Sequence, residues 1–508
     1  MADDLSPTRI ISDPGVKRDG TLLEGSNYVD AQWCRFQRGL PRKIGGYRVL
    51  NKYLDSIPRA LHDFTQNQRT YVHTGSATKL GQFSIDSSGS ASVVSDRTPA
   101  IAASDDNTWQ LDALFEAGGA TQLIAQVAPN LSDISNNTGG ELYAGNLTAV
   151  TALSAVTLPV GGNVTGGICV LHPYLFYFGS DGYTGWSVAG SPTDLTSAGS
   201  GSANPATQKV IRGMPLRGGP GNSPSGVFWS LDTLFRASFV GGSPIFSFDT
   251  LATGISVMSP NSIIEYNGIF YWLGVDNIFS FNGVVREVSN LMNFNWFFDN
   301  INTAHSQKVF AVKVPRFGEI WWCAPLFGAT EPSHALIYNV RENLWYDTEL
   351  PNGGRSAGIF TSVYQKPIMS GVEIDGSSNY KMWTHEIGTD EVDGAMAQPI
   401  NSYFETNEIS LAEQGREGSV RCVMVEPDFV QTGDMTLQIR GRRNARAPEN
   451  DGEIYTFSDT AMSENEQIVH AKEQRRLLRF KFGSNTVGGH YEMGHVLAHL
   501  GEGDGRVT

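Results

Sequence analysis

The segment from Asn261 to Val288, NSIIEYNGIFYWLGVDNIFSFNGVVREV, alternates short apolar and aromatic runs with residues that favour tight turns. Asn267-Gly268 and Asn282-Gly283 are typical two-residue hairpin turns, because Asn and Gly reach positive φ at the least cost. Val275-Asp276-Asn277 makes a third reversal between them. The segment therefore predicts a meander of antiparallel strands with the size and shape of one β-propeller blade. The predicted strands are Ser262–Tyr266, Ile269–Leu273, Ile278–Phe281 and Val284–Val288.

The same module recurs along the chain as an aromatic strand, a glycine and a second aromatic strand. It is found in YVHTGSATKLGQF, LFYFGSDGYTGWSV and IFYWLGVDNIFSF, whose glycines are Gly75, Gly179 and Gly274. Their separations, 179 − 75 = 104 and 274 − 179 = 95, are each about twice the ~40–50 residues of a propeller blade. Another aromatic strand pair, HALIYNVRENLWYDTEL, begins at His334 and has Asn343 in its turn. The middle of the chain is expected to hold about six to eight degenerate blades, with an irregular pair of β-sandwiches as the alternative.

Two flanking regions differ from this middle part. From about residue 400 the strands become longer, and period-two alternation places Met435, Leu437 and Ile439 on one face of a separate sheet. The first ~55 residues show few strand patterns but many basic and aromatic residues. We expect an all-β fold: a β-propeller of antiparallel four-stranded blades with an N-terminal strap and a C-terminal β-sandwich-like domain. The expected parts are an extended strap (1–55), the propeller (56–398) and a C-terminal antiparallel β domain (399–508).

Composition limits the class of protein. A length of 508 residues exceeds the roughly 250–300 that one hydrophobic core serves, so two or three units are expected. The net charge of −15 and a pI near 5.1 disfavour tight binding to nucleic-acid phosphates. No apolar run approaches the ~20 residues needed to span a bilayer, so no membrane insertion is expected. The N-terminus has no secretory pattern, which predicts synthesis in a cytoplasm. The four dispersed cysteines are expected to be buried free thiols: Cys34, Cys169, Cys323 and Cys422.

Residues that could carry chemistry form few recognisable patterns. His490, His495 and His499 are the only histidine cluster. In a strand they cannot grip one ion, whereas a helix would bring only the last two together, and neighbouring glycines disfavour a helix. We therefore interpret them as structural, and predict no metal and no cofactor.

An acidic group after His385 is the strongest candidate for catalysis. Glu386, Asp390 and Glu391 could be acid and base groups of a glycan-cleaving propeller. Acidic residues in loops are more often simply solvated, and the sequence contains no nucleophile elbow, phosphate-binding lysine loop or metal-binding helix motif. We predict that the chain is not an enzyme.

Arginines of the C-terminal region form two clusters. One interpretation makes them the solvated face of the C-terminal sheet, and the other makes them an interface that meets an acidic surface of another subunit. The clusters are Arg440, Arg442, Arg443 and Arg446, then Arg475, Arg476 and Arg479. With anchors from the strap, the possible subunit interface comprises Trp33, Arg35, Arg38, Arg440, Arg442, Arg443, Arg475 and Arg476.

Several phrases, in order along the chain, resemble the tail nozzle proteins of short-tailed bacteriophages, which include packaged-DNA stabilisation and tail tubular proteins. The likeness covers scattered phrases rather than one block, and residues about 85 to 165 carry none of them. The phrases are Asn27–Asp30, Trp33–Phe36, Pro41–Tyr47 with its K-x-G-G turn, Phe228–Ser230, Leu234–Arg236, Phe239–Gly241, Ser259–Ile263, Ile337–Val340, Asn343–Trp345, Glu405-Thr406, Glu426–Phe429, Gly433–Thr436 and Gly488-Gly489 through Gly494.

The resemblance implies a structural protein of the virion tail, made in the cytoplasm of a host bacterium. The resemblance implies that copies, six as the expected number, form a homo-oligomeric ring below the portal and adaptor, contact other tail proteins or fibres, and extend the DNA channel. Such a ring would enclose DNA without binding it tightly, and would help to retain and then deliver the packaged genome. No catalytic residues come with this family.

Two other functions remain open. One is a receptor-binding or glycan-degrading propeller of a tail fibre, although fibre proteins usually show trimer-forming repeats that are absent here. The other is a free cytoplasmic propeller scaffold. A glycan site would need aromatic platforms, whereas the strand alternation of Trp186, Trp272 and Trp345 favours the core.

Overall fold

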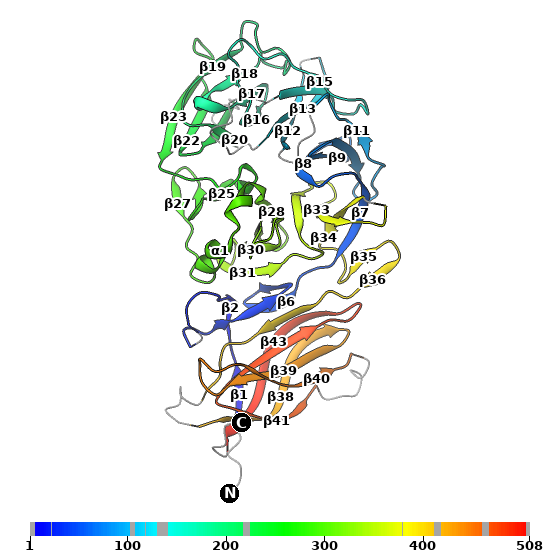
Figure 1. Ribbon diagram of the computed structural model, residues 1–508, viewed down its shortest axis with the longest axis vertical. Coiled ribbons are helices and arrows are strands. Elements are labelled where there is room, and N and C mark those ends of the chain that lie inside the picture. The colour runs from blue at the N-terminus through cyan, green and yellow to red at the C-terminus, as the bar shows by residue number, and fades with distance from the viewer. Residues whose placement is uncertain are drawn as a thin grey trace.

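The structure is a computed structural model, and it contains 55% strand and 4% helix, which confirms the all-β class. A propeller occupies one end of the elongated molecule and a β-sandwich the other (Figure 1). The described residues are 6–21, 23–101, 107–116, 118–129, 141–216, 224–377, 379–410, 418–459 and 467–503.

The predicted meander forms one four-stranded antiparallel sheet, as expected. Its strands are β24 (Ile264–Tyr266), β25 (Ile269–Leu273), β26 (Ile278–Phe281) and β27 (Val285–Glu287). Asn267 and Gly268 both have positive φ, 53° and 83°, so the two-residue turn is confirmed. The second predicted turn is wrong by one residue. Phe281 pairs with Val285, so Val284 joins the loop and only Gly283 takes positive φ.

Five more four-stranded sheets, and four strands of a six-stranded sheet, complete a ring of blades in the described part of the chain. The blades are β8 (Pro58–Gln66), β9 (Arg69–Ser76), β10 (Leu80–Ile85) and β11 (Ser95–Asp96); β12 (Asn107–Phe115), β13 (Thr121–Pro129), β14 (Glu141–Asn146) and β15 (Ser154–Ala155); β16 (Gly167–Leu171), β17 (Tyr174–Phe178), β18 (Thr184–Trp186) and β19 (Gly201–Ala203); β20 (Val210–Pro215), β21 (Ser225–Ser230), β22 (Thr233–Phe239) and β23 (Phe246–Thr253); then, after β24–β27, β28 (Phe310–Val314), β29 (Glu319–Ala324), β30 (His334–Asn339) and β31 (Leu344–Glu349); and last β32 (Arg355–Phe360), β33 (Pro367–Ile374), β34 (Tyr380–His385) and β7 (Tyr47–Leu54).

The ring closes because the first strand of the last blade, β32, contacts the first strand of the first blade, β8. Strand β7, from near the N-terminus, pairs with β34 as the fourth strand of the last blade, and β35 (Glu391–Asp393) and β36 (Met396–Gln398) extend the same sheet beyond it. Gly75, Gly179 and Gly274 lie at the ends of the second strands of the first, third and fifth blades. The spacing between successive glycines therefore corresponds to two blades, as the sequence predicts. Helices are short: η1 (Ser180–Gly182), η3 (Pro260–Ser262), α1 (Phe294–Asn300) and η4 (Thr303–Lys308).

The second domain is a sandwich of two sheets. The first sheet contains β41 (Val469–Arg475), β38 (Val420–Thr432), β43 (His490–Glu502), β6 (Leu40–Lys43), β5 (Cys34–Gln37) and β1 (Ser6–Ile10). The second contains β4 (Asp30–Gln32), β37 (Ser402–Glu405), β42 (Leu477–Ser484), β39 (Met435–Arg442) and β40 (Asn450–Phe457). The inward-facing Met435, Leu437 and Ile439 are fully buried, which confirms the predicted alternation.

The N-terminal segment does not form the expected extended strap. Its strands β1, β5 and β6 join the first sandwich sheet, β4 joins the second, and β7 joins the propeller. A further short pair, β2 (Asp13–Val16) and β3 (Asn27–Tyr28), is parallel. The chain therefore builds part of the sandwich, completes the whole propeller, and returns through the hairpin β35 (Glu391–Asp393) and β36 (Met396–Gln398) to finish the sandwich.

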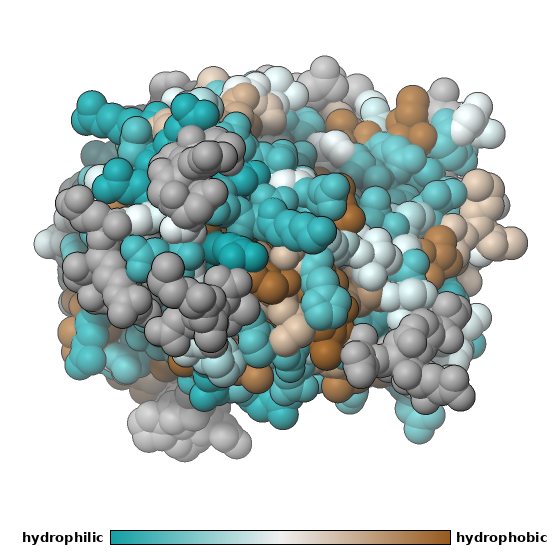
Figure 2. Space-filling model, turned by 90° about the horizontal axis from the view of Figure 1, so that it is seen from below, coloured by the Kyte–Doolittle hydropathy of each residue, from teal (hydrophilic) through white to brown (hydrophobic). Residues whose placement is uncertain are grey.

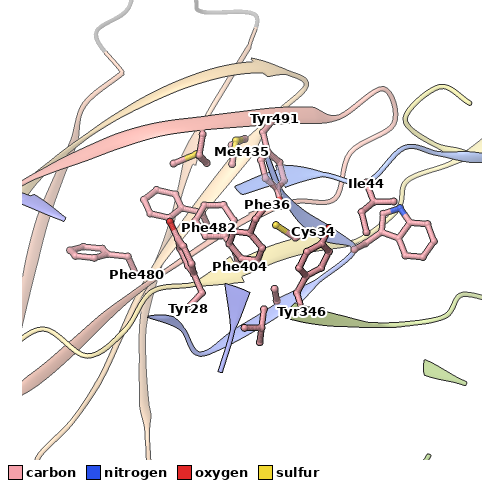
Figure 3. Close-up of a cluster of buried hydrophobic side chains, with 14 of the residues drawn as sticks. Tyr28, Cys34, Phe36, Ile44, Tyr346, Phe404, Met435, Phe480, Phe482 and Tyr491 are labelled. Carbon is pink, nitrogen blue, oxygen red and sulfur yellow. The ribbon is translucent and has the colours of Figure 1, made fainter. Parts of the chain in front are cut away.

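One continuous hydrophobic cluster joins the two domains. Tyr28 and Phe36 from the N-terminal segment meet Tyr346 of the propeller and Phe404 and Phe482 of the sandwich (Figure 3). The ring centroids of Phe36 and Tyr346 are 5.6 Å apart, and those of Tyr28 and Phe404 are also 5.6 Å apart. Aromatic side chains of this size contribute much of the burial energy of a core, so we infer that the domains form one cooperative unit.

Replacing Gly268 with Val tests the meander. Its φ of 83° is strained for a β-branched residue, while an added Cβ would meet nothing within 4 Å, so backbone strain alone should act. We expect a loss of about 1 kcal/mol or more in the free energy of unfolding. Gly268→Asn is the control, because Asn tolerates positive φ. Equal thermal melting of the Val variant and the wild type would contradict the assigned turn.

Candidate functional site

A buried group of charged side chains lies between the two domains. Arg35 on β5 is 1% exposed, and its Nε approaches Glu319 Oε1 of the propeller at 2.8 Å. Its Nη1 donates to Glu386 Oε2 at 2.9 Å. Glu319 also accepts hydrogen bonds from Trp321 Nε1 at 2.8 Å and from the Tyr346 hydroxyl at 2.7 Å. The two carboxylates and the guanidinium form a buried ionic triad that joins the sandwich to the propeller.

Burial and charge act in opposite directions on this triad. Burial alone would lower the pKa of Arg35, but Glu319 and Glu386 outweigh it and raise that pKa further above its usual range. Burial raises the pKa of Glu319, and the charge of Arg35 partly offsets the rise. The Arg35 guanidinium also lies 3.6 Å above the ring of Phe317. Arg35 and Glu319 therefore each favour the charged form of the other out of water.

The K-x-G-G turn lies beside the triad and is shaped by close contacts. A Cβ on Gly46 would come 2.4 Å from the carbonyl oxygen of Asp390, and one on Gly45 would come 2.8 Å from Glu386 Oε2. Lys43 is buried and donates from Nζ to the carbonyl oxygen of Gly489 at 2.8 Å. Both glycines are thus needed because backbone from the end of the propeller passes where a side chain would be.

The predicted acid and base candidates have structural partners. His385 is 3% exposed, and its Nε2 accepts a hydrogen bond from Arg355 Nε at 3.1 Å. Burial, followed by the charge of Arg355, holds the pKa of His385 well below its usual value, so the ring stays neutral. Asp390 accepts from the Gly488 backbone N at 2.9 Å, and Glu391 accepts from the Tyr47 hydroxyl at 3.0 Å.

The prediction that this acidic loop is merely solvated is wrong. The side chain of Glu386 is only 10% exposed, because its charge faces Arg35 rather than water. Glu386 and Asp390 are therefore expected to matter for the joint between the domains, whereas a dispensable loop charge would contribute little.

Two arginines, one from each C-terminal cluster, pair with carboxylates of their own subunit. Arg440 contacts Glu405 at 3.0 Å and Glu449 at 2.9 Å. Arg479 contacts Glu405 at 3.4 Å and Glu408 at 2.8 Å. Burial raises the pKa of Glu405, and the two arginines counteract it. The cluster is a half-buried ionic network on the second sandwich sheet.

Of the predicted interface residues, Trp33 and Arg35 are each 1% exposed. They lie inside the joint between the domains, and their assignment to an outer surface is corrected. Arg440 and Arg442 pair with acidic residues of the network, and Arg475 pairs with Glu473 at 3.0 Å. The sequence placed the aromatic and basic segment of Trp33 and Arg35 at a surface, because it does not show which carboxylates the arginine contacts.

The remaining predicted interface residues are exposed. The Arg38 side chain is 77% exposed, and Arg443 and Arg476 are exposed as well. Arg442 pairs with Leu477 across adjacent strands, so Arg443 and Arg476 lie at the same end of the sandwich. Hydrophilic side chains cover most of this end of the molecule, with smaller hydrophobic areas between them (Figure 2).

The predicted histidine cluster and the four cysteines do not form a metal site in the described ranges. His490, His495 and His499 lie on one strand, β43, and His499 Nε2 lies 2.8 Å from Glu426 Oε1. No group of three or more His, Cys, Asp or Glu residues is placed to hold a metal ion among the residues that the structure describes. All four cysteines are buried, as predicted, and burial raises the pKa of Cys34 to about 12.

Large aromatic residues belong to the core rather than to a binding platform. Trp186, Trp272 and Trp345 are 6%, 0% and 3% exposed, which confirms the prediction from strand alternation. No helix in the described ranges is long and apolar enough to cross a membrane.

A cavity of about 340 Å³ lies among the first strands of five blades, and sequence reasoning missed it. Its wall is about equally polar and apolar, and it includes several charged residues: Arg59, Asp63, Arg212, Glu265 and Lys313. A lone charge between apolar neighbours, as in Ile211-Arg212-Gly213, is the only sequence signal for such a wall. The spacing of blades did not reveal which residues face the axis.

Comparisons with known proteins concern the fold. No protein-family model matches the sequence, and no curated protein matches it either. Among solved structures, the chain is similar to the WD40 β-propeller domain of Doa1, with a TM-score of 0.40 and 11% sequence identity, over 67% of this chain and 97% of that one. The assignment of a β-propeller rests on the strand pairing itself.

Replacing Arg35 with Met tests the joint between the domains. The variant would leave Glu319 and Glu386 buried without their cation, and we expect a loss of about 3–5 kcal/mol in the free energy of unfolding. The control is Arg236→Met, which breaks the exposed pair with Asp249 and should cost about 0–1 kcal/mol after screening by solvent. Denaturant melts compare the two variants. Equal losses would contradict the role of the triad.

Proposed function

We propose that the chain is a non-catalytic structural subunit of the tail nozzle of a short-tailed bacteriophage. Copies of it would form a ring, with six as the expected number, below the portal and adaptor. The ring would extend the DNA channel and help to retain and then deliver the packaged genome. The proposal rests on the ordered sequence phrases that resemble this family.

One observation carries the proposal: phrases far apart in the sequence meet at the joint between the domains. Val29 N donates to the carbonyl oxygen of Glu405 at 3.1 Å, which joins the first phrase to one near the C-terminus. Lys43 Nζ contacts the carbonyl oxygen of Gly489 at 2.8 Å, which joins the K-x-G-G turn to the last phrase. Residues that must fit one another in three dimensions form a more specific resemblance than the same phrases would form separately.

Charge supports the same role. Asp and Glu outnumber Lys and Arg by 52 − 37 = 15. A channel wall rich in Lys and Arg would bind phosphates and slow the passage of DNA, whereas an acidic or neutral wall would let it slide. Many of the arginines that could bind phosphate are already paired with carboxylates, as in the network around Arg440. Retention of the genome would then depend on a constriction or on closure by another tail component.

The exposed Arg38, Arg443 and Arg476 are the remaining candidates for a contact between subunits. Their charges would attract an acidic surface of the next copy, which fits head-to-tail ring assembly by a net-acidic subunit.

Genome retention tests the proposed function. Particles assembled without this chain should lose their packaged DNA, and the purified chain should show no measurable binding to duplex DNA at physiological salt. Electron micrographs of the chain mixed with portal–adaptor complexes should show a ring below the adaptor. Full retention of DNA without the chain, or tight and salt-sensitive DNA binding, would overturn the proposal. Loss of host attachment with normal DNA retention would favour the receptor- or glycan-binding alternative.

Reversing two exposed charges tests the contact between subunits. Arg443→Glu combined with Arg476→Glu should leave a folded monomer that no longer forms rings, because like charges would then face each other. Ring formation is measured by analytical ultracentrifugation and electron microscopy. Arg236→Glu, on an exposed propeller strand, is the control and should still assemble. Normal rings from the double variant would exclude these arginines from the interface.

A further inference from the structure

The cavity among the inner strands of the propeller has the dimensions of a small-molecule site. It measures about 340 Å³, near the lower end of the roughly 300–1,000 Å³ typical of such sites. Strands β8, β20, β24, β28 and β32 contribute its lining, so parts distant in sequence converge on it. Leu61, Met214 and Phe360 are among its apolar residues. Apolar side chains together with convergent polar groups are typical of ligand sites, and this wall is more polar than most.

Arg212 brings a positive charge without a direct partner to this wall. Among the described residues, its guanidinium has neither a hydrogen bond nor an ion pair, and its Nε is buried without a partner. Burial lowers the pKa of Arg212, and the charges of Cys169 and Asp112 offset this fall only in part. The Asp112 carboxylate already accepts from the backbone N of Val170 at 2.7 Å and of Ala113 at 2.8 Å. A guanidinium nitrogen buried without an acceptor costs free energy unless a ligand supplies one.

Asp63 brings a carboxylate without a direct partner to the same cavity. Its carboxylate has no ion pair or hydrogen bond with another residue in the described ranges. Burial raises its pKa to about 6, and Lys313 only partly offsets the rise. Lys313 is itself engaged, since its Nζ donates to the carbonyl oxygen of Glu265 at 3.1 Å and lies 3.5 Å from Glu265 Oε2.

We propose that this cavity binds a small zwitterion of the amino-acid or short-peptide class, with its carboxylate on Arg212 and its ammonium group on Asp63. The inference goes beyond the proposed tail function and does not depend on it. A simple anion would leave Asp63 unmatched, and a simple cation would leave Arg212 unmatched. Only a ligand with both charges compensates both side chains while its apolar part contacts the rest of the wall.

The glycine series from glycine to tetraglycine tests the proposal by isothermal titration calorimetry on the full chain. Each added residue moves the ammonium and carboxylate groups apart by at most about 3.3–3.6 Å, so the series measures the separation that the cavity prefers. One member should bind about tenfold or more tightly than acetate or ethylammonium at equal ionic strength. Acetate binding as tightly as the best peptide would overturn the zwitterion assignment. So would the absence of binding by every member.

Two isosteric variants locate the site. Arg212→Gln and Asp63→Asn should each weaken binding of the preferred peptide by about tenfold or more, because each removes one charged partner. Arg236→Gln is the matched control, since this arginine is exposed on β22 of the same blade as Arg212. If Arg212→Gln does not fold, Asp63→Asn carries the test alone. Unchanged affinity in folded Asp63→Asn would overturn the proposal.

Discussion

The structure depends on one buried guanidinium. Arg35 belongs to the sandwich, and the two carboxylates that neutralise it belong to the propeller blade of Glu319 and to the segment that leaves the propeller at Glu386. Removing three charges from water is costly, and the cost is recovered only when all three lie in one geometry. The triad therefore specifies how the domains meet, whereas the surrounding aromatic cluster supplies most of the apolar burial.

This constraint explains the local chemistry around it. Gly45 and Gly46 allow the propeller backbone to approach, and Lys43 satisfies a carbonyl group of the sandwich. His385 remains neutral because burial lowers its pKa and the charge of Arg355, from which it accepts a hydrogen bond, lowers it further. Each of these residues is polar or small because it contacts a residue from another part of the chain.

The blade architecture was predictable from sequence because its signals are local. Asn267-Gly268 fixes a turn through its own backbone preferences, and the alternation around Met435 depends only on neighbouring residues. The Asn282 turn was predicted wrongly by one residue, because the Asn-Gly sequence occurs both in two-residue type I′ turns and in three-residue loops. Where local chemistry decides the structure, the sequence is sufficient.

The candidate site was less predictable because its contacts are remote. Arg35 meets Glu319 and Glu386, which are 284 and 351 positions away. Pattern reasoning assigned the arginine to a surface and the glutamate to solvent, since it had no means of bringing them together. The cavity wall at Arg212 was missed for the same reason. Polar residues within strands acquire a role only when the ring of blades closes around its axis.

The route of the chain through the two domains has a mechanical consequence. Strand β1 pairs with β43 so that Ser6 lies opposite Leu500, and the strands that enter and leave the propeller pair at Tyr47 and His385 (Figure 1). Tension applied between the N-terminal and C-terminal ends of the chain would first separate β1 from β43, one hydrogen bond at a time. The propeller is a closed loop beyond that point, so it would carry no load until the sandwich had opened.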